Sequence, residues 1–169
     1  MAQLTAGRIM NALAGLFSSL DATDRTLLER TLSGRRFEKV RLFDAATAGT
    51  AMTTTPFFTN QTGGNLRVIS VKVIAPIAVA ADNTDYVTFT CAKVDSAGAN
   101  AATVATADTR AASLNALAAH TAEALTNTVA NLVLADGWSL TAAVAKAGAG
   151  KAITAATSDA YMIVELMPE

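Results

Sequence analysis

The stretch that decides the fold class is Asp82-Asn83-Thr84-Asp85-Tyr86-Val87-Thr88-Phe89-Thr90-Cys91-Ala92-Lys93-Val94-Asp95-Ser96-Ala97-Gly98. Turn-forming residues stand at both of its ends, and between them Val87, Phe89 and Cys91 alternate with aromatic, hydroxyl and small side chains. Alternation with a period of two is typical of a strand that buries one face. We therefore expect a strand over Tyr86–Val94, with the Cys91 thiol turned towards the core.

Further segments of this kind occur along the chain. Strands are expected at Leu66–Ile74 and at residues 103–106, 124–128, 132–134, 138–146 and 161–166. Asp136-Gly137 and Ala147-Gly148-Ala149-Gly150 are turn signals between them. Residues 111–126 are ambiguous, because their Ala and Leu content favours a helix within a β-rich context, so irregular structure or a short helix is expected there. Many short strands joined by turns predict a mainly β protein, an antiparallel β-sandwich or barrel.

The N-terminal region has a different periodicity. Apolar side chains repeat there at helical spacing, at Ile9, Leu13, Leu16 and Leu20. A second short helix is predicted from an N-cap at Asp21 to Gly34, with Leu27 on its apolar face. The sequence therefore predicts three parts: a helical N-terminal arm over 1–44, a linker or extended arm over 45–64, and a β-sandwich domain over 65–169.

Two segments between the expected helices and the sandwich are candidates for partner contacts. Residues 35–41 hold four positive charges and one negative charge around Phe37, and both a solvated extended connector and a docking site for an acidic surface fit this pattern. Residues 45–64 carry no charge, and Phe57 and Phe58 follow Pro56 within them. Two adjacent Phe side chains would be costly to expose, so we expect them to start the first strand or to anchor the arm on a neighbour.

The overall composition limits the partners. The 13 Lys and Arg side chains are balanced by 14 Asp and Glu side chains, so no global charge favours nucleic acid or a membrane surface. The longest apolar run, residues 73–81, is interrupted by Pro76 and is too short to span a bilayer. Aromatic residues make up only 5% of the chain, which predicts a thin core, and we therefore expect a homo-oligomer.

Candidate chemistry is sparse. His120 is the single histidine of the sequence and is interpreted as a surface or interface residue, because a metal site would have to be completed by carboxylates alone. Gly148-Ala149-Gly150-Lys151 has some features of a phosphate loop, but it lacks the earlier Gly and the Ser or Thr after the Lys. A hairpin turn is the expected structure of this motif.

Two further motifs have both a structural and a functional interpretation. Asp82 and Asp85 could offer oxygens to calcium, and both are also ordinary turn formers. Asn60-Gln61-Thr62 has the form of an N-glycosylation acceptor, which often arises by chance. No catalytic, cofactor-binding or metal-binding residue is predicted, and we expect that the protein is not an enzyme.

The order of strand and turn signals resembles a known group of proteins. The segments are Asp82-Asn83-Thr84-Asp85-Tyr86-Val87-Thr88-Phe89, Leu132-Val133-Leu134-Ala135-Asp136-Gly137-Trp138-Ser139-Leu140 and Val144-Ala145-Lys146-Ala147-Gly148-Ala149-Gly150. Over residues 55–166 they are similar to the head decoration (cement) proteins of tailed bacteriophages. That resemblance implies a jelly-roll-like β-sandwich on the capsid exterior of the virion, made in the host bacterial cytoplasm, that bridges subunits of the major capsid protein. The homo-oligomer would then be a dimer or a trimer.

The expected contacts with the capsid lie on the arm, the basic segment and the Phe pair. The residues predicted to bind the partner are Leu13, Phe17, Leu27, Arg35, Arg36, Phe37, Arg41, Phe57 and Phe58. The alternative is a phage tail or fibre component with a receptor- or carbohydrate-binding β-sandwich, for which Tyr86, Trp138 and Tyr161 are the rings available for stacking.

Overall fold

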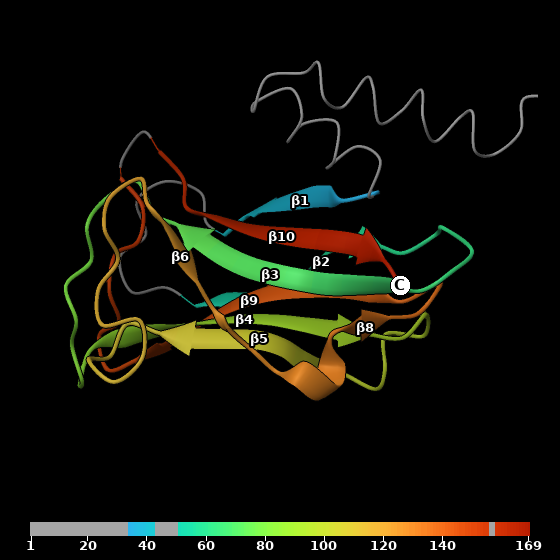
Figure 1. The fold of residues 1–169 in the computed structure, drawn as a ribbon. Coiled ribbons are helices and arrows are strands. Elements are labelled where there is room, and N and C mark those ends of the chain that lie inside the picture. The colour runs from blue at the N-terminus through green and yellow to red at the C-terminus, as the bar shows by residue number, and fades with distance from the viewer. Residues whose placement is uncertain (1–33, 43–50, 156–157) are drawn as a thin grey trace, which may run out of the picture. The chain divides into compact units, whose positions relative to one another are not determined.

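Two antiparallel sheets pack face to face in the part of the chain that the computed structural model describes, residues 34–42, 51–155 and 158–169 (Figure 1). The elements are β1 (Arg36–Arg41), β2 (Met52–Thr59), β3 (Leu66–Ile74), β4 (Tyr86–Val94), β5 (Ala102–Asp108), β6 (Ala122–Ala124), β7 (Thr126–Asn127), the 3-10 turn η1 (Val129–Asn131), β8 (Val133–Leu134), β9 (Ser139–Ala147) and β10 (Tyr161–Pro168). Among these residues there is no helix with the length and hydrophobicity that crossing a membrane requires.

The order of the strands defines the sandwich. The first sheet runs β1-β10-β3-β6, with β8 also paired to β3, and the second sheet runs β2-β9-β4-β5-β7. Every strand pair in both sheets is antiparallel. The prediction of a mainly β protein with an antiparallel sandwich is confirmed, and β3 and β4 have the bounds that the sequence predicts.

The core lies between the inward faces of the two sheets. Alternate residues of β4 and β9 turn inwards, and Phe89, Cys91 and Leu140 are each 0% exposed. The facing side chains from β3 and β10 are Val68, Val71, Val73, Met162, Val164 and Leu166. Burial raises the pKa of the Cys91 thiol to about 12, so this thiol stays protonated and packs as a small apolar group.

The ambiguous segment after β5 forms turns and irregular structure instead of a helix. Val79 and Leu117 exchange two backbone hydrogen bonds of 2.9 Å, and Leu117 is buried in the core, which holds the loop in place. The single strand expected at 124–128 is divided into β6 and β7, because Leu125 turns inwards between the two sheets.

The basic segment is a strand, which corrects the interpretation of it as a solvated connector. β1 pairs with β10 without a register shift. Half-buried side chains alternate along it with exposed ones, Arg36, Glu38 and Val40 against Phe37, Lys39 and Arg41. Because charged residues lie on both faces of the strand, its sequence does not show the alternation of apolar and polar residues that predicts a strand.

Part of the expected linker is also a strand. β2 pairs with β9, with register shifts around Thr55 and Pro56. Proline has no amide hydrogen to donate, so it fits β2 at the edge of its sheet. The compact unit that contains the sandwich begins at Arg36, so it is longer than the expected 65–169. The predicted N-terminal helices, with Leu13, Phe17 and Leu27, lie outside the described residues.

One long side of the sandwich is closed by a segment that passes from sheet to sheet. β6 pairs with β3 in the first sheet, β7 pairs with β5 in the second, and β8 returns to β3, as the diagonal path of β6 shows in Figure 1. The Leu125 N–H donates to the Val71 carbonyl at 2.9 Å, and the Asn131 side-chain amide donates to the Thr103 carbonyl at 2.8 Å. One backbone bond and one side-chain bond thus hold the connecting segment against strands of both sheets.

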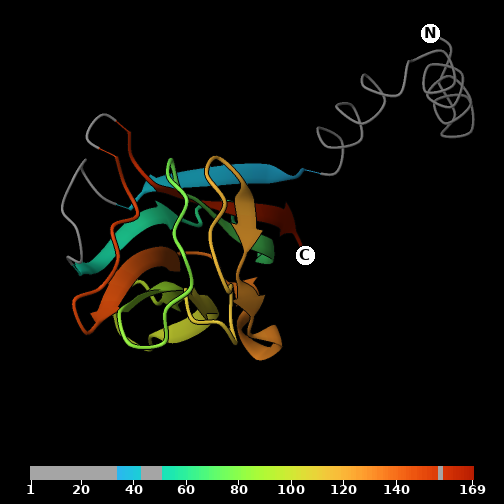
Figure 2. The ribbon, with the colours of Figure 1, turned by 90° about the vertical axis from the view of Figure 1, so that its left-hand side faces the viewer.

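The two ends of the sandwich differ in the length of their loops. Long connections lie at one end, which is turned towards the viewer in Figure 2. They comprise residues 75–85, 109–121, 148–155 and 158–160. Residues 60–65, 95–101 and 135–138 are short connections at the other end. We call these the long-loop end and the tight-turn end.

Candidate functional site

The loops of the long-loop end are fastened to one another. The Asp82 N–H donates to the Thr109 carbonyl at 3.1 Å, and the His120 N–H donates to the Ala75 carbonyl at 2.8 Å. His120 is exposed and has a backbone φ of 58°, a left-handed conformation that the bond to Ala75 helps to hold. Loops on a rigid scaffold are where binding residues concentrate, so this end is the candidate functional site.

Asp82 and Asp85 brace these loops. Asp82 Oδ1 accepts from the N–H groups of Thr84 (2.9 Å) and Asp85 (3.0 Å), while its Oδ2 lies 2.8 Å from Lys151 Nζ. The Lys151 ammonium, with these backbone donors, holds the pKa of Asp82 well below its usual range. Asp85 Oδ1 accepts from the Ala149 N–H at 2.7 Å. The two carboxylates therefore act as turn formers, and no group of three or more His, Cys, Asp or Glu side chains that could hold a metal ion exists among the described residues.

The motif with features of a phosphate loop is a tight turn, but it is not the hairpin turn that was predicted, because β9 and the next strand, β10, lie in different sheets. The Gly150 N–H donates to the Ala147 carbonyl at 2.9 Å, and Gly148 has a φ of +56°. A Cβ on Gly148 would collide with the Asp85 carboxylate and would lie 2.8 Å from the Thr84 carbonyl oxygen. Glycine is required here because the loop approaches the 82–85 turn so closely.

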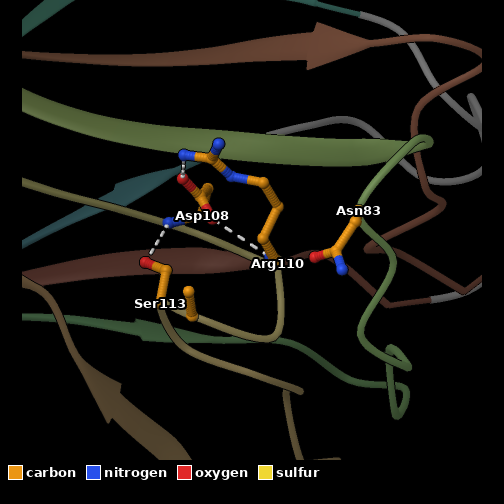
Figure 3. A pocket seen from close by; sticks show the side chains of 5 residues that line it. Asn83, Asp108, Arg110 and Ser113 are labelled. Atoms are coloured by element: carbon orange, nitrogen blue, oxygen red, sulfur yellow. Dashed lines mark hydrogen bonds and ion pairs between the residues drawn. The ribbon is translucent and has the colours of Figure 1, made fainter.

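A first hollow at this end has a volume of about 490 Å³ (Figure 3). Its lining residues are Asn83, Asp108, Arg110, Ala112 and Ser113. Asp108 ends β5 and is 7% exposed, and the Arg110 guanidinium beside it holds the pKa of its carboxyl below the usual range. The same ion pair raises the pKa of Arg110, so both groups stay charged at neutral pH.

A second hollow, of about 330 Å³, lies where β3 ends and β10 begins. Its lining residues are Ile74, Pro76, His120, Ser158, Asp159 and Tyr161. Asp159 Oδ2 accepts from Arg41 Nη1 at 3.4 Å, and Lys39 Nζ lies 3.5 Å from the centroid of the Tyr161 ring. At this hollow, two cations of β1 therefore occupy one carboxylate oxygen of Asp159 and one face of the Tyr161 ring.

The predicted contact residues of the basic segment divide between the two faces of β1. The Arg36 guanidinium lies 4.4 Å from the centroid of the Phe58 ring and 2.5 Å from Glu38 Oε1. Phe37 points the other way, with 52% of its surface exposed. Arg35 precedes the strand and is exposed, and Arg41 at the end of the strand is also exposed.

The two adjacent Phe residues lie in β2. Phe58 faces Leu140 of β9 and is buried in the core, so its ring belongs to the fold and is not available to a partner. Phe57 is half-buried and packs against the same core. The pair therefore does not start the first strand, as was expected, but lies near the end of β2, the second strand. The burial of Phe58 removes its ring from the candidate contact surface.

The rings available for carbohydrate stacking each have a cation above one face. The pairs, with the distance from the cation to the ring centroid, are Arg110 over Tyr86 (4.8 Å), Lys93 over Trp138 (5.3 Å) and Lys39 over Tyr161 (3.5 Å). All three rings are also partly buried. A sugar would have to displace a cation to stack on these ring faces.

The glycosylation-like triplet has a structural role at the tight-turn end. Asn60 is 0% exposed, and its side-chain amide donates to the carbonyls of Gly64 (2.8 Å) and Leu134 (2.9 Å). Its Oδ1 accepts from the N–H and the hydroxyl of Thr62. The folded domain therefore has no accessible amide at Asn60 for a glycan.

Sequence reasoning missed most of the first hollow. Arg110 and Ser113 lie in a segment without periodicity, and Asp108 lies just beyond the strand that was expected at 103–106. The available signal was the spacing Asp108-Thr109-Arg110, an acid and a base two residues apart directly after a strand. The spacing alone does not predict the ion pair between Asp108 and Arg110, because the pair forms only when the chain turns after β5.

Comparisons with known proteins show similarity only at the level of solved structures. No protein-family model and no curated protein matches the chain. One similar structure is a CocE/NonD family hydrolase from Staphylococcus aureus, with a TM-score of 0.36, 11% identity, and coverage of 79% of this chain and 36% of that one. Another is a structure of the Gt strain of infectious bursal disease virus, with a TM-score of 0.30, 14% identity, and coverage of 79% and 33%. This chain spans about a third of the length of each, and neither similarity bears on its function.

Proposed function

We propose that this protein is a structural virion protein that binds the outside of a phage capsid and stabilises it by bridging major capsid protein subunits. The observation that carries the proposal is the outward face of β1, where exposed Phe37 stands between exposed cations on a strand anchored in the sheet by β10. A large apolar side chain surrounded by positive charge fits an acidic protein surface with an apolar recess. The resemblance in strand and turn order to jelly-roll-like decoration proteins supports the same conclusion.

The mechanism would be thermodynamic. The sandwich brings a preformed edge strand to the capsid, so little conformational entropy is lost on docking. Binding to the assembled shell, and not to its separated subunits, shifts the equilibrium towards the closed particle. A homo-oligomer would engage several capsid subunits at once and raise the total affinity further.

The second candidate function is a phage tail or fibre component that binds a receptor or a carbohydrate. The observation that favours it is the pair of polar hollows at the long-loop end. The cations above the Tyr86, Trp138 and Tyr161 rings argue against sugar stacking, so the capsid role ranks first.

The experiment that tests the proposal counts copies of the protein in purified particles from its source. Quantitative mass spectrometry would give its ratio to the major shell protein. A near-stoichiometric ratio supports the capsid role, a handful of copies per particle moves the protein to the tail or fibre, and its absence from particles contradicts both.

Docking through β1 has its own test. In Phe37→Ser, we expect binding to particles that lack the protein to weaken at least about tenfold, because a large interface side chain is lost. Val129→Ser is the matched control, since Val129 is another exposed large apolar residue, 76% exposed, on η1. Equal binding by the two variants would show that the face of β1 is not the docking surface.

A further inference from the structure

Arg110 is held in place at the first hollow by an acid and an aromatic ring. Its Nη2 donates to Asp108 Oδ2 at 2.5 Å, and its guanidinium carbon lies 4.8 Å from the centroid of the Tyr86 ring. Asp108 Oδ1 accepts from the backbone N–H of Arg110 at 3.0 Å, which fixes the acid as well. The Arg110 side chain remains 47% exposed, so a preorganised guanidinium is presented to solvent (Figure 3).

The acceptor atoms around this hollow are occupied by the protein itself. Both carboxylate oxygens of Asp108 accept from Arg110. Asn83 Oδ1 accepts from the Ala111 N–H at 3.2 Å, and Ser113 Oγ accepts from the Asp108 N–H at 3.0 Å. Internal bonds therefore use acceptor oxygens of Asp108, Asn83 and Ser113.

The donors around the hollow are not occupied in the same way. Within the part of the chain that the structure describes, Arg110 Nε and Nη1 and Asn83 Nδ2 donate no hydrogen bond, whereas a side-chain hydrogen bond from Ser113 helps to lower the pKa of Asp108. Arg110 and Asn83 come from two loops, and the bond from Ala111 to Asn83 ties the loops together. The unused hydrogen-bonding capacity of the hollow thus consists of donors, one of which carries a positive charge.

We propose that this hollow binds the carboxylate of a small acidic ligand. The remaining guanidinium donors of Arg110 would bind the carboxylate, and the Asn83 amide would bind its other oxygen or a neighbouring acceptor. A volume of about 490 Å³ leaves room for the body of a sugar acid or an N-acylated amino acid. The site lies away from the β1 face and requires no capsid, so it goes beyond the proposed function and is tested without particles.

The neighbouring charges limit the affinity that we expect. Asp108 already neutralises Arg110, so the attraction for an anion comes from directed hydrogen bonds more than from net charge. The ligand would also be partly exposed. Binding should therefore be weak and should fall as the salt concentration rises.

The test is a titration of the full chain, labelled with ¹⁵N, with D-glucuronate, with N-acetyl-L-glutamate and with neutral D-glucose. We expect at least one of the two acids to shift the amide signals of residues around Asn83 and Arg110, and we expect D-glucose to have no effect. The first acid represents a sugar source of the carboxylate and the second a peptide source. No shift with either acid, or an equal shift with D-glucose, overturns the proposal.

Two variants assign the binding to these side chains. Asn83→Asp keeps the oxygen that accepts from Ala111 but replaces the amide donors with a negative charge, so binding should weaken at least about tenfold in a folded protein. Arg110→Gln should abolish binding, and Arg67→Gln is its matched control, because Arg67 is similarly exposed and paired with Glu169 away from the hollow. Unchanged binding in a folded Asn83→Asp protein overturns the site.

Discussion

The long-loop end and the tight-turn end close the same two sheets in different ways. At the tight-turn end, one buried side chain, Asn60, makes two hydrogen bonds to backbone carbonyls and accepts two from Thr62. At the long-loop end, exposed or half-exposed groups such as Asp82, Asp85 and Lys151 bridge separate loops. The first arrangement concentrates stability in one position, and the second distributes it over contacts that remain within reach of solvent and of ligands.

This difference indicates which end is suited to binding. A buried amide that saturates its partners leaves no hydrogen-bonding capacity for anything else. Surface pairs contribute little stability each, so their residues can be replaced without loss of the fold. The long-loop end therefore supports hollows with unused donors, while the tight-turn end fixes how β2, β8 and β9 meet.

The largest expected effect is at the tight-turn end. Replacing Asn60 with Ala removes the amide that pairs with the Gly64 and Leu134 carbonyls, and it should lower the free energy of unfolding by about 3 kcal/mol. Urea unfolding monitored by Trp138 fluorescence measures the change. Asn65→Ala is the control, since Asn65 is exposed in the same turn. If the two variants were equally stable, Asn60 would not be the residue that fixes this end.

The next effect compares one glycine at each end. Gly148→Ala should destabilise by about 2 kcal/mol, because its positive φ and its approach to the Asp85 carboxylate and the Thr84 carbonyl leave no room for a methyl group. Gly98→Ala at the tight-turn end has a similar φ of +74° but no atom within 4 Å of the added Cβ, and it should cost only about 1 kcal/mol. The difference between the two variants, measured by chemical unfolding, isolates the close approach of the loops. Equal losses would show that the loops at the long-loop end are not in tight contact.

The pH dependence of stability tests one carboxylate at each end of the sandwich. The pKa of Asp82 is lowered first by Lys151, and the pKa of Asp95 at the tight-turn end is lowered first by the Ala99 N–H. Because both folded-state pKa values lie below the unfolded value of about 4, each group stabilises the fold above that pH and loses its contribution as the pH falls. Asp82→Asn and Asp95→Asn should each flatten the fall in melting temperature below about pH 4.

Added salt should separate these two carboxylates. The Asp82–Lys151 attraction is screened by ions, whereas the turn bonds of Asp95 to Ala97, Ala99 and Asn100 are short-range. Melting temperatures at low and high ionic strength, measured for both variants and the unchanged protein, test this. A salt response of the same size for both groups would mean that the long-loop end does not depend on charge.

The sandwich could be predicted from the sequence where one face of a strand is apolar. β3 and β4 show a period of two or a continuous β-branched run, and both bounds were predicted correctly. β1 was not predicted because its half-buried face carries Arg36 and Glu38, which form an ion pair, and the Arg36 guanidinium lies over the Phe58 ring. β2 was not predicted because its Thr-rich sequence with Pro56 has the composition of a linker. Its strand conformation depends on pairing with β9.

The candidate site was harder to predict than the fold for a physical reason. A strand is specified by neighbours two residues away, whereas the contacts at the long-loop end join residues far apart in the chain, such as Asp82 with Lys151 and Asn83 with Ala111. Turn chemistry identified Asp82 and Asp85 as turn formers but could not name their partners. The hydrogen-bonding capacity left at Arg110 became visible only after its internal partners were known.

The smallest expected effect is that of an exposed ion pair outside both sets of contacts. Arg67 on β3 lies 3.2 Å from Glu169, and both side chains are substantially exposed. Such pairs gain little because water screens the charges and two long side chains must be ordered, so Arg67→Gln should change the free energy of unfolding by no more than about 0.5 kcal/mol. Urea unfolding at low and high salt measures it. A loss comparable with that of Asn60→Ala would mean that surface charge also determines stability away from the long loops, and the contrast between the two ends would then no longer hold.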